Sequence, residues 1–332
     1  MLAAGGLGYI ILEGVTDILG IHQEDHEIIV EVPRGSSLTD ISNILEEKGV
    51  VKSGKLFKIW DGYADLAGDY QFGTFVLNTN MSYEEIMLEL KQYNIAKESV
   101  RITFPEGSNL FDISKLLEEK GVCTADAFLE ALNNTNFGYE FMDQISDNEM
   151  KYFKMEGYAF PDTYDFYLDD NPVSVAQRFL NNLNKKFTDE MYARVNELGL
   201  SFEEFMTLAS IVQAEAPTKD QMENVASVYW NRLHNAAEFP KLQADPTRVY
   251  GRELQADMQI INHDLINAYD TYESDGLPPG PICNPGLEAI MATLYPAETD
   301  YYYFCSNLKT GECYYATNLE EHNKNLRTAG LR

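Results

Sequence analysis

The chain has 332 residues, which exceeds the usual size of one compact domain and leaves room for two or three. Apolar residues make up 45% of the sequence, so the chain can bury a core and lacks the composition of a disordered protein. Lysine and arginine total 25 against 53 acidic residues, and the net charge of -28 repels phosphate backbones and anionic lipid headgroups. These numbers argue against a nucleic-acid-binding protein and against a protein held on lipid by its own charge.

The sequence opens with a short apolar segment. Residues 2–12 (LAAGGLGYIIL) carry no charge, yet they are well short of the roughly 20 residues that span a bilayer. The pattern fits a short buried segment or the end of a membrane anchor, and we expect residues 1–26 to be the remnant of an anchor with its linker. His22 and His26 in this linker are spaced like metal ligands, but no third ligand lies nearby and we expect no metal site.

The clearest pattern is an internal repeat with an offset of 72 residues. Residues 33–50 and 105–122 are identical at 13 of 18 positions, and each copy follows a short alternating run typical of a β-strand. Each copy also begins with a helix N-cap and ends near a glycine, a residue that often terminates helices. The pattern predicts two small strand–helix units over residues 27–150. Such units resemble LysM-like modules that contact glycans, and a spacer role fits the same pattern.

A buried acid is the first chemical signal. A capping box at Ser201 starts a predicted helix, and Pro217 limits its far end. Glu215 lies in the last turn on the same face as Ile211, so burial and the negative end of the helix dipole should both raise its pKa. A carboxylic acid that keeps its proton near neutral pH is suited to general acid catalysis. A glutamate that reaches solvent or pairs with Arg232 would show the same pattern.

Loops rich in proline and glycine follow this helix at 242–247, 276–281 and 284–286. Such loops hold polar and aromatic side chains in fixed positions, as glycan-binding sites require. The tyrosines would cover sugar faces and the polar groups would bind hydroxyl or acetamido groups, although ordinary packing explains any single tyrosine. The candidate substrate-binding residues are Asn231, Gln243, Asp245, Thr247, Tyr250, Tyr269, Tyr272 and Asn284.

Two of the four cysteines flank a predicted hairpin. Cys305 and Cys313 lie at the ends of a turn-rich stretch between two tyrosine-rich runs, which predicts antiparallel strands on which the cysteines would face each other. A disulfide and two free thiols fit this pattern equally, and a disulfide requires an oxidising compartment. The chain has no CxxC pair and no Cys/His cluster with zinc-ligand spacing, so we expect no structural zinc.

Several segments together resemble one known family. They are EGYAFPDTY (156–164), LASIVQAEA (208–216), VASVYWNRL (225–233), LQADPTRVYG (242–251), YDTY (269–272), GLPPGPICNPG (276–286), YYYF (301–304) and EHN (321–323). Their order and spacing are similar to those of the YceG-like, or MltG, family of endolytic murein transglycosylases, and the repeat unit is similar to the N-terminal part of that family. The resemblance implies a mixed α+β catalytic domain over residues 151–332 that follows the two repeats.

The resemblance also implies an activity. Enzymes of this family cleave the MurNAc-β-1,4-GlcNAc bond within nascent peptidoglycan strands without water, which leaves a 1,6-anhydro-MurNAc end and terminates strand elongation. The catalytic acid of the family falls on Glu215. Gln213 stands where the family has a first acid, Asp270 where Asn is common and Ala244 where Ser is common. The contacts of those two loops therefore transfer less securely than the acid.

One carboxyl group suffices for such a reaction. Glu215 would donate its proton to the leaving glycosidic oxygen and then, as a carboxylate, remove the proton of the C6 hydroxyl that attacks C1. A hydrolytic muramidase would need a second carboxyl, for which Asp245 is the candidate. A third possibility is a peptidoglycan-binding scaffold without activity, in which Glu215 is structural.

The resemblance implies where the protein works and with what. No cofactor is expected. The partners are peptidoglycan glycan strands and also peptidoglycan synthases, the penicillin-binding proteins, because an enzyme that cuts growing strands works where they are polymerised. We expect a single-pass protein of the cell membrane with its catalytic domain on the extracytoplasmic side.

Overall fold

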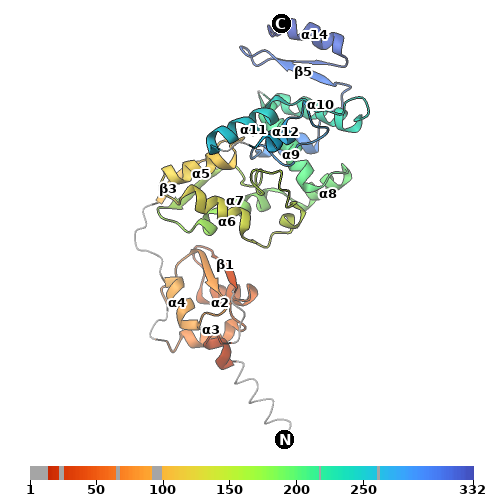
Figure 1. The fold of residues 1–332 in the computed structure, drawn as a ribbon. Coiled ribbons are helices and arrows are strands. Elements are labelled where there is room, and N and C mark those ends of the chain that lie inside the picture. Colours follow the sequence, from red (N-terminus) through yellow and green to blue (C-terminus); the bar gives the residue numbers. More distant parts are fainter. Residues whose placement is uncertain (1–13, 22–25, 65–67, 92–98, 217, 260–261) are drawn as a thin grey trace. The chain divides into compact units, whose positions relative to one another are not determined.

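The computed structural model describes residues 14–21, 26–64, 68–91, 99–216, 218–259 and 262–332. Helices and short antiparallel strand pairs make up a mixed α+β fold, as the sequence predicted (Figure 1). The chain divides into two compact units between Glu98 and Ser99. None of the helices in the described ranges is both long and apolar enough to cross a membrane. The expected anchor remnant falls mostly on residues 1–13 and 22–25, which lie outside the described residues.

Unit 1 is a small strand–helix–helix–strand–helix unit. Its elements are β1 (Glu27–Val32), α2 (Leu38–Glu47), α3 (Gly54–Asp61), β2 (Gly73–Asn78) and α4 (Tyr83–Lys91). The two strands pair antiparallel, with Val30 opposite Phe75. Every element contributes to one core, which includes the buried side chains of Val30, Leu45, Phe57, Leu77 and Ile86.

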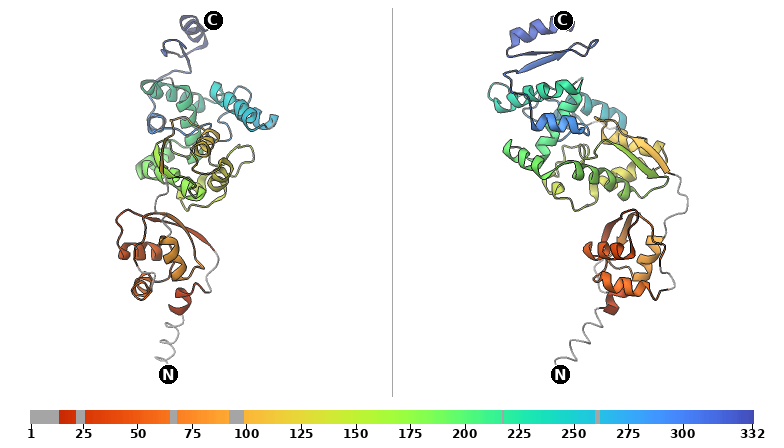
Figure 2. Two further views of the ribbon diagram at one scale, coloured as in Figure 1. Left: turned by 90° about the vertical axis from the view of Figure 1, so that its left-hand side faces the viewer. Right: turned by 180° about the vertical axis from the view of Figure 1, so that it is seen from behind.

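Unit 2 contains the remaining elements and one larger core. They are β3 (Ser99–Thr103), α5 (Leu110–Glu119), α6 (Ala125–Asn134), η1 (Glu140–Gln144), β4 (Thr163–Tyr167), α7 (Pro172–Lys186), α8 (Asp189–Glu197), α9 (Phe202–Glu215), η2 (Lys219–Gln221), α10 (Met222–His234), α11 (Asp245–Met258), α12 (His263–Tyr269), α13 (Leu287–Leu294), β5 (Tyr303–Ser306), β6 (Cys313–Ala316) and α14 (Leu319–Thr328). Two further views show the β3–β4 pair beside α5, α6 and α7 (Figure 2).

Helix α9 forms the centre of unit 2. It begins at the predicted capping box, in which the Ser201 hydroxyl accepts a hydrogen bond from the Glu204 amide at 3.2 Å and the Glu204 carboxylate accepts one from the Ser201 amide at 2.8 Å. Residues 205–212 are buried without interruption, because α8, α10, α11, α13 and η1 all pack against this helix. The sequence predicted one apolar stripe, and the structure encloses α9 on every side.

The two copies of the repeat have the same local structure. In each copy a strand leads to a turn with a glycine at φ +84°, Gly35 or Gly107, and the helix ends before a second left-handed glycine, Gly49 or Gly121. Each helix also begins with a side chain that accepts a hydrogen bond from the backbone three residues later. The predicted repeat is confirmed. Each copy adds a second helix and a second strand that the pattern did not predict, and the likeness to LysM-like modules stays a prediction.

The second repeat is part of the larger unit. Its strand β3 pairs with β4, so that Val100 lies opposite Phe166. The ring of Phe104, which follows β3, packs on Phe179 of α7 with ring centres 5.0 Å apart. The contacts therefore divide the chain near residue 98, whereas the sequence suggested a boundary near residue 150. The difference arises because β3 finds its partner strand in a segment that the sequence pattern had assigned to the next domain.

The C-terminal hairpin forms as predicted, but its cysteines do not face each other. Strand pairing places Tyr314 opposite Cys305 and Ser306 opposite Cys313. Successive side chains along a strand point to opposite faces, so the two cysteines lie on different faces of the hairpin. Both are free thiols. The suggested disulfide is therefore wrong, because a one-residue difference in register separates the two sulfur atoms.

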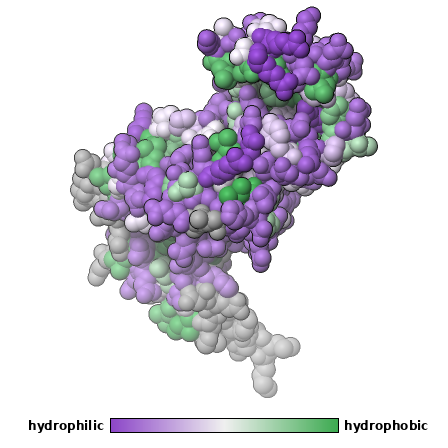
Figure 3. Space-filling model, turned by 45° about the horizontal axis from the view of Figure 1, so that its top comes forward, coloured by the Kyte–Doolittle hydropathy of each residue, from purple (hydrophilic) through white to green (hydrophobic). Residues whose placement is uncertain are grey.

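The surface reflects the composition. Figure 3 shows a mostly hydrophilic face with smaller hydrophobic areas. Exposed ion pairs occur, for example between Arg101 and Asp165 at 2.8 Å. With 25 basic residues for 53 acids, such pairs cannot neutralise the surface, and exposed pairs stabilise a fold only weakly.

The loop before β4 gives a test of the packing in unit 2. Gly157 has φ +92°, and a Cβ atom there would lie 2.5 Å from the Cβ of Pro281. We expect Gly157→Ala to lower the free energy of unfolding by more than about 2 kcal/mol, since a left-handed backbone costs roughly 1–2 kcal/mol and overpacking about 1–3 kcal/mol. Gly199→Ala is the control, because Gly199 has φ +76° but nothing within 4 Å of its Cβ position. Equal losses in chemical denaturation would contradict the contact with Pro281.

Candidate active site

Three helices meet at the carboxyl group of Glu215. This residue ends α9 and is partly buried. Its Oε1 accepts a hydrogen bond of 2.8 Å from the hydroxyl of Tyr229 on α10. The backbone amide of Asp245, the first residue of α11, donates a second hydrogen bond to the carboxylate. Ala244, the N-cap of this helix, has no side chain that accepts a hydrogen bond, so the Asp245 amide is not capped from within α11.

Burial raises the pKa of Glu215 to about 7, and the negative charge of Asp245 acts in the same direction. The hydrogen bonds from Tyr229 and from the Asp245 amide, together with the positive charge of Arg232, act against this rise. The sequence correctly predicted burial as the first cause. It named the end of α9 as the second cause, which stays a prediction, and the structure adds the charge of Asp245. A carboxyl with this pKa can both give and take a proton near neutral pH.

Arg232 is a buried positive charge near this acid. Its Nε donates to the carbonyl of Tyr302 at 2.7 Å and its Nη1 to the carbonyl of Leu242 at 2.7 Å. Among the described residues it forms no ion pair with a carboxylate, so the alternative in which Glu215 is neutralised by Arg232 is not what the structure shows. Burial lowers the pKa of Arg232, and its charge still reaches Glu215. The positive charge of Arg232 thus stabilises the carboxylate form of Glu215 without a direct ion pair.

Two of the predicted binding residues, Asp245 and Tyr272, lie beside the acid. Next to burial, the charge of Asp245 raises the pKa of Glu215, and the charge of Glu215 in turn raises the pKa of Tyr272. The hydroxyl of Tyr272 donates a hydrogen bond to Asp245. Arg248 pairs with Asp245 at 2.7 Å and lies over the ring of Tyr272 at 4.8 Å. Gln243 is exposed, and its φ of +55° is a strained backbone conformation of the kind that collects at functional sites. The structure thus brings Asp245 and Tyr272 to Glu215, whereas the Oε1 of Gln243 accepts from Nη1 of Arg232 at 3.4 Å.

The other predicted binding residues have structural roles here. Thr247 and Asn284 have no exposed surface, and Tyr250 and Tyr269 are buried. The Asn284 side chain accepts from the amide of Ala159 at 2.8 Å and donates to the carbonyl of Ser108 at 2.8 Å. In this structure these side chains are not available to a glycan, and the prediction that they contact substrate is corrected accordingly.

Asn231 is also used inside the unit. Its Nδ2 donates to the carbonyls of Thr299 and Tyr301 at 2.8 and 2.9 Å, which fixes the segment before β5. Like the buried polar residues above, Asn231 already uses its side-chain hydrogen bonds within the protein. The sequence alone does not distinguish a polar residue that binds a ligand from one that stabilises a loop by hydrogen bonds to the backbone.

Gln213 connects α9 to the loop before α13. Its Oε1 accepts from the amide of Gly286 at 2.9 Å. This bond needs an acceptor oxygen but no charge, which agrees with the inference that the position need not ionise. The same loop reaches α9 again where the Ile282 amide donates to the Ser210 hydroxyl at 3.0 Å. The loop over residues 276–286 therefore contacts the half of α9 that carries Glu215 at two points.

Glu156 is a buried acid that sequence reasoning did not single out. Its carboxylate accepts from the Leu110 amide at 3.1 Å, from the Tyr250 hydroxyl at 3.1 Å and from Asn284 Nδ2 at 3.2 Å. Burial raises its pKa to about 8 against these donors. It joins the second repeat, α11 and the loop before α13. The one feature of the sequence that could have indicated a buried acid is its position beside a glycine in an otherwise aromatic segment.

The turn of the second repeat also reaches this loop. The Gly107 amide donates to the Asn284 carbonyl at 2.9 Å, and the Asn284 amide donates to the Ser108 carbonyl at 2.9 Å. The described residues contain no group of three or more His, Cys, Asp or Glu side chains that would hold a metal. His22, one of the two histidines considered as metal ligands, lies outside the described residues.

Comparison with known proteins decides the family. The sequence model of the YceG-like family matches residues 30–328. The chain belongs to the YceG-like family. The family resemblance of the sequence motifs is therefore confirmed.

Three proteins are similar to this YceG-like protein over most of its length. It is 29% identical to a Bacillus subtilis (strain 168) protein named endolytic murein transglycosylase, and the match covers 89% of this chain and 82% of that one. It is also 28% identical to a Streptococcus pneumoniae serotype 2 protein of the same name. That match covers 98% of this chain but only 62% of the relative. A crystal structure of a YceG-like protein from Listeria monocytogenes, 28% identical, has a TM-score of 0.56 and covers 91% of this chain and 99% of that chain.

The hydrogen bond from Tyr229 predicts the titration of Glu215. We expect Tyr229→Phe to raise the pKa of Glu215 from about 7 by about 1, because a hydrogen bond to a charged group contributes roughly 1.5–3 kcal/mol and one pKa unit equals about 1.4 kcal/mol. NMR titration of the glutamate carboxyl carbons measures this, with Glu215→Gln identifying the signal. Tyr295→Phe, at a half-exposed tyrosine, is the control. An unchanged midpoint in Tyr229→Phe would contradict the hydrogen bond.

The buried acid predicts a pH dependence of stability. Glu156 keeps its proton to about pH 8 in the folded chain, whereas an ordinary glutamate has a pKa of 4.5. Between these values the unfolded chain binds fewer protons, so this residue makes the free energy of unfolding fall as pH rises. Glu156→Gln keeps the shape and removes this contribution, which should flatten the slope measured by urea denaturation between about pH 5 and 8. Exposed Glu130→Gln should leave the slope unchanged, and the same slope in both variants would refute the assignment.

Proposed function

We propose that this YceG-like protein is a peptidoglycan lytic transglycosylase that cleaves the MurNAc-β-1,4-GlcNAc bond within glycan strands. The observation that carries the proposal is the carboxyl of Glu215, whose pKa of about 7 makes it a proton donor at neutral pH. The names of the Bacillus and Streptococcus relatives support the same substrate class. No cofactor takes part in the proposed reaction.

In the first step the protonated Glu215 donates its proton to the glycosidic oxygen. The bond from C1 of MurNAc to that oxygen breaks, the GlcNAc side leaves with the new hydroxyl, and positive charge develops at C1 and the ring oxygen. Glu215 becomes a carboxylate. The Tyr229 hydroxyl, the Asp245 amide and the charge of Arg232 then stabilise that carboxylate, so the proton is easier to release.

In the second step the carboxylate of Glu215 takes the proton of the MurNAc C6 hydroxyl. The oxygen of this hydroxyl forms a bond to C1, which yields the 1,6-anhydro-MurNAc end and returns the acid to its starting state. The nucleophile belongs to the substrate, so no water molecule and no second carboxylate are required. The raised pKa suits both steps, because the same group must lose and regain a proton.

Hydrolysis by Glu215 and Asp245 is the second candidate, and the electrostatic contact between these two residues favours it. Against it, Asp245 is paired with Arg248 and hydrogen-bonded by Tyr272, which leaves it poorly placed to activate water. The two reactions differ in their product, since hydrolysis leaves a free reducing end. Mass spectrometry of the digested glycan separates them, and a reducing MurNAc end would favour the muramidase.

We further propose that the catalytic unit works outside the cytoplasm beside the peptidoglycan synthases. The proposal is supported by the location of its substrate and by the apolar residues 2–12 of the sequence. Recovery of the full-length protein in the soluble cytoplasm would refute the location. Crosslinking that recovers no penicillin-binding protein would refute the partnership.

The proposed acid predicts the effect of one substitution. Glu215→Gln keeps the shape of the side chain and removes its exchangeable proton, so we expect formation of anhydro-muropeptides to fall at least about 100-fold, the lower range for a general acid and base. Mass spectrometry of digested peptidoglycan measures this. Glu204→Gln, in the first turn of the same helix, is the matched control and should cost about 1 kcal/mol of stability while keeping turnover. Near-normal product from Glu215→Gln would show that the acid is misassigned.

A further inference from the structure

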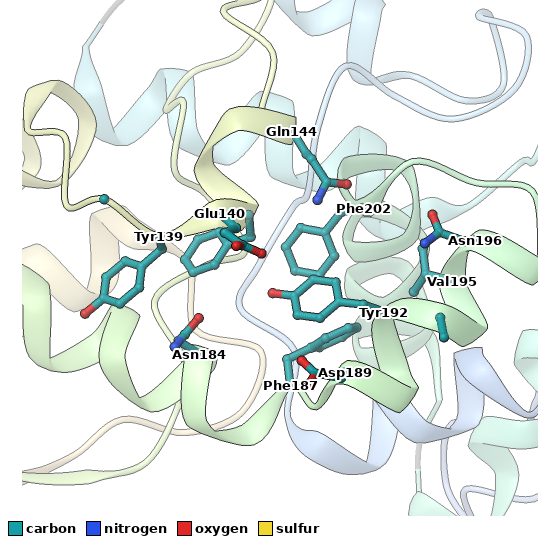
Figure 4. A pocket seen from close by; sticks show the side chains of 13 residues that line it. Tyr139, Glu140, Gln144, Asn184, Phe187, Asp189, Tyr192, Val195, Asn196 and Phe202 are labelled. Carbon is teal, nitrogen blue, oxygen red and sulfur yellow. The ribbon is translucent and has the colours of Figure 1, made fainter.

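Unit 2 contains a pocket of about 670 Å³ beside η1 and α8 (Figure 4). The rings on its wall pack against one another, for example Phe202 on Phe187 with ring centres 5.0 Å apart. Packing in the core therefore accounts for these rings without a ligand. Several apolar side chains of unit 1 are different, because they face solvent.

The first described segment, residues 14–21, is fixed on unit 1 by a buried acid. Asp17 is 2% exposed, and its carboxylate accepts a hydrogen bond of 2.9 Å from the backbone amide of Lys52, just before α3. Gly14 extends this contact, since a Cβ atom there would lie 3.4 Å from the side chain of Leu56. The segment therefore lies beside the start of α3, as the ribbon views also show (Figure 1, Figure 2).

Apolar side chains point away from unit 1 on both of these elements. Val15 and Leu19 are joined by a helical backbone hydrogen bond, lie on the side opposite Asp17, and are 46% and 51% exposed. Ile59 on α3 is 49% exposed, and Tyr63, four residues later, is 85% exposed. Single exposed apolar residues are common, but four on two neighbouring elements form a surface patch of the kind that marks an interaction site.

Lysines accompany these apolar residues. Residues 48–58 contain no acid and four exposed lysines: Lys48, Lys52, Lys55 and Lys58. Within the described ranges none of the four forms an ion pair. Glu46 is the exposed acid beside the start of α3, where its carboxylate accepts from the Gly54 amide at 3.2 Å. In a chain with 25 basic residues and 53 acids, this is a local excess of positive charge.

The second repeat provides an internal comparison. Its helix α6 corresponds to α3, because each begins at an N-cap whose side chain accepts from an amide three residues later. Counted from the two caps, Lys55 and Ile59 of α3 correspond to Asp126 and Glu130 of α6, and all four side chains are exposed. The second copy thus has the acids of an ordinary solvated surface at positions where the first copy has a lysine and an isoleucine.

We propose that the face of unit 1 formed by residues 14–21 and 52–63 lies on the surface of a lipid bilayer with anionic headgroups. Exposed aliphatic and tyrosine side chains suit the membrane interface, and lysines reach the headgroups while their stems stay on apolar surface. The net charge of -28 opposes adsorption of the chain as a whole, so the contact depends on this local face. Residues 2–12, which carry no charge, come shortly before it in the sequence.

The contact is tested with the full chain and vesicles made of equal amounts of phosphatidylcholine and phosphatidylglycerol. Hydrogen exchange followed by mass spectrometry should show slower exchange of the amides in α3 and in residues 14–21 when these vesicles are added. Helix α6 is the internal control, and its exchange should stay the same. Vesicles of phosphatidylcholine alone should protect α3 less, because they lack the anionic headgroups that attract lysines.

A double substitution tests the side chains. Lys55→Asp with Ile59→Glu introduces into α3 the residues that α6 has at the same positions, and sedimentation should show at least about tenfold weaker partition into the mixed vesicles. Lys185→Asp with Leu308→Glu is the matched control, since it makes the same change in charge at exposed residues of unit 2 and should bind like the parent. Circular dichroism checks the fold, and Lys55→Asp alone serves if the double variant is unfolded.

The outcomes are independent of glycan cleavage and so of the proposed function. Unchanged exchange of α3 and of residues 14–21 in vesicle-bound chain would overturn the inference, because the chain would then be held elsewhere. Equal partition of the Lys55→Asp, Ile59→Glu variant and the parent would overturn it too. Protection of α3 by soluble peptidoglycan fragments but not by vesicles would also contradict it and would indicate a glycan site on unit 1.

Discussion

The hydrogen bonds of Glu156 hold together the part of unit 2 that carries the acid. One buried carboxyl accepts from the start of α5, from Tyr250 on α11 and from Asn284 before α13. These three donors come from segments far apart in the sequence. An unpaired buried acid would be costly, so each donor that is present stabilises the arrangement of the others. The position of α11 matters most, because its first amide reaches Glu215.

The chemistry at Glu215 results from a balance of opposing effects. Burial and Asp245 favour the protonated acid, while Tyr229, the α11 amide and Arg232 favour the carboxylate. Either set alone would fix the group in one state, and a lytic transglycosylase would need both states in each cycle. Arg232 acts on Glu215 through its charge and not through a hydrogen bond, because its Nε and Nη1 donate to backbone carbonyls. Ala244 contributes by leaving the start of α11 uncapped.

Local patterns predicted local structure well. The capping box of α9, the burial of Glu215 and the two repeats follow from residues within a few positions of each other, and so does the hairpin near the C-terminus. The contacts of Asn284 do not, because its partner Ser108 lies 176 residues earlier. The compact units divide near residue 98 and not near residue 150 for the same reason, since β3 pairs with a strand beyond α6. The register of the hairpin depends on its turn, in which the Asn307 amide donates to the Glu312 carbonyl at 2.9 Å, and the sequence pattern does not specify that pairing.

The two repeats show how one short sequence can serve two settings. The positions that are identical in both copies include the glycines and helix residues that each copy needs for itself. The second residue differs, with Arg34 in the first copy and Glu106 in the second. The carboxyl end of Glu106 lies against Gly286, about 2.2 Å from where a Cβ atom of residue 286 would be, so a side chain there would have to displace it. Exchanging the copies would thus preserve every helix cap and still place an arginine against the loop that Gln213 holds, so duplicated sequence here is not interchangeable sequence.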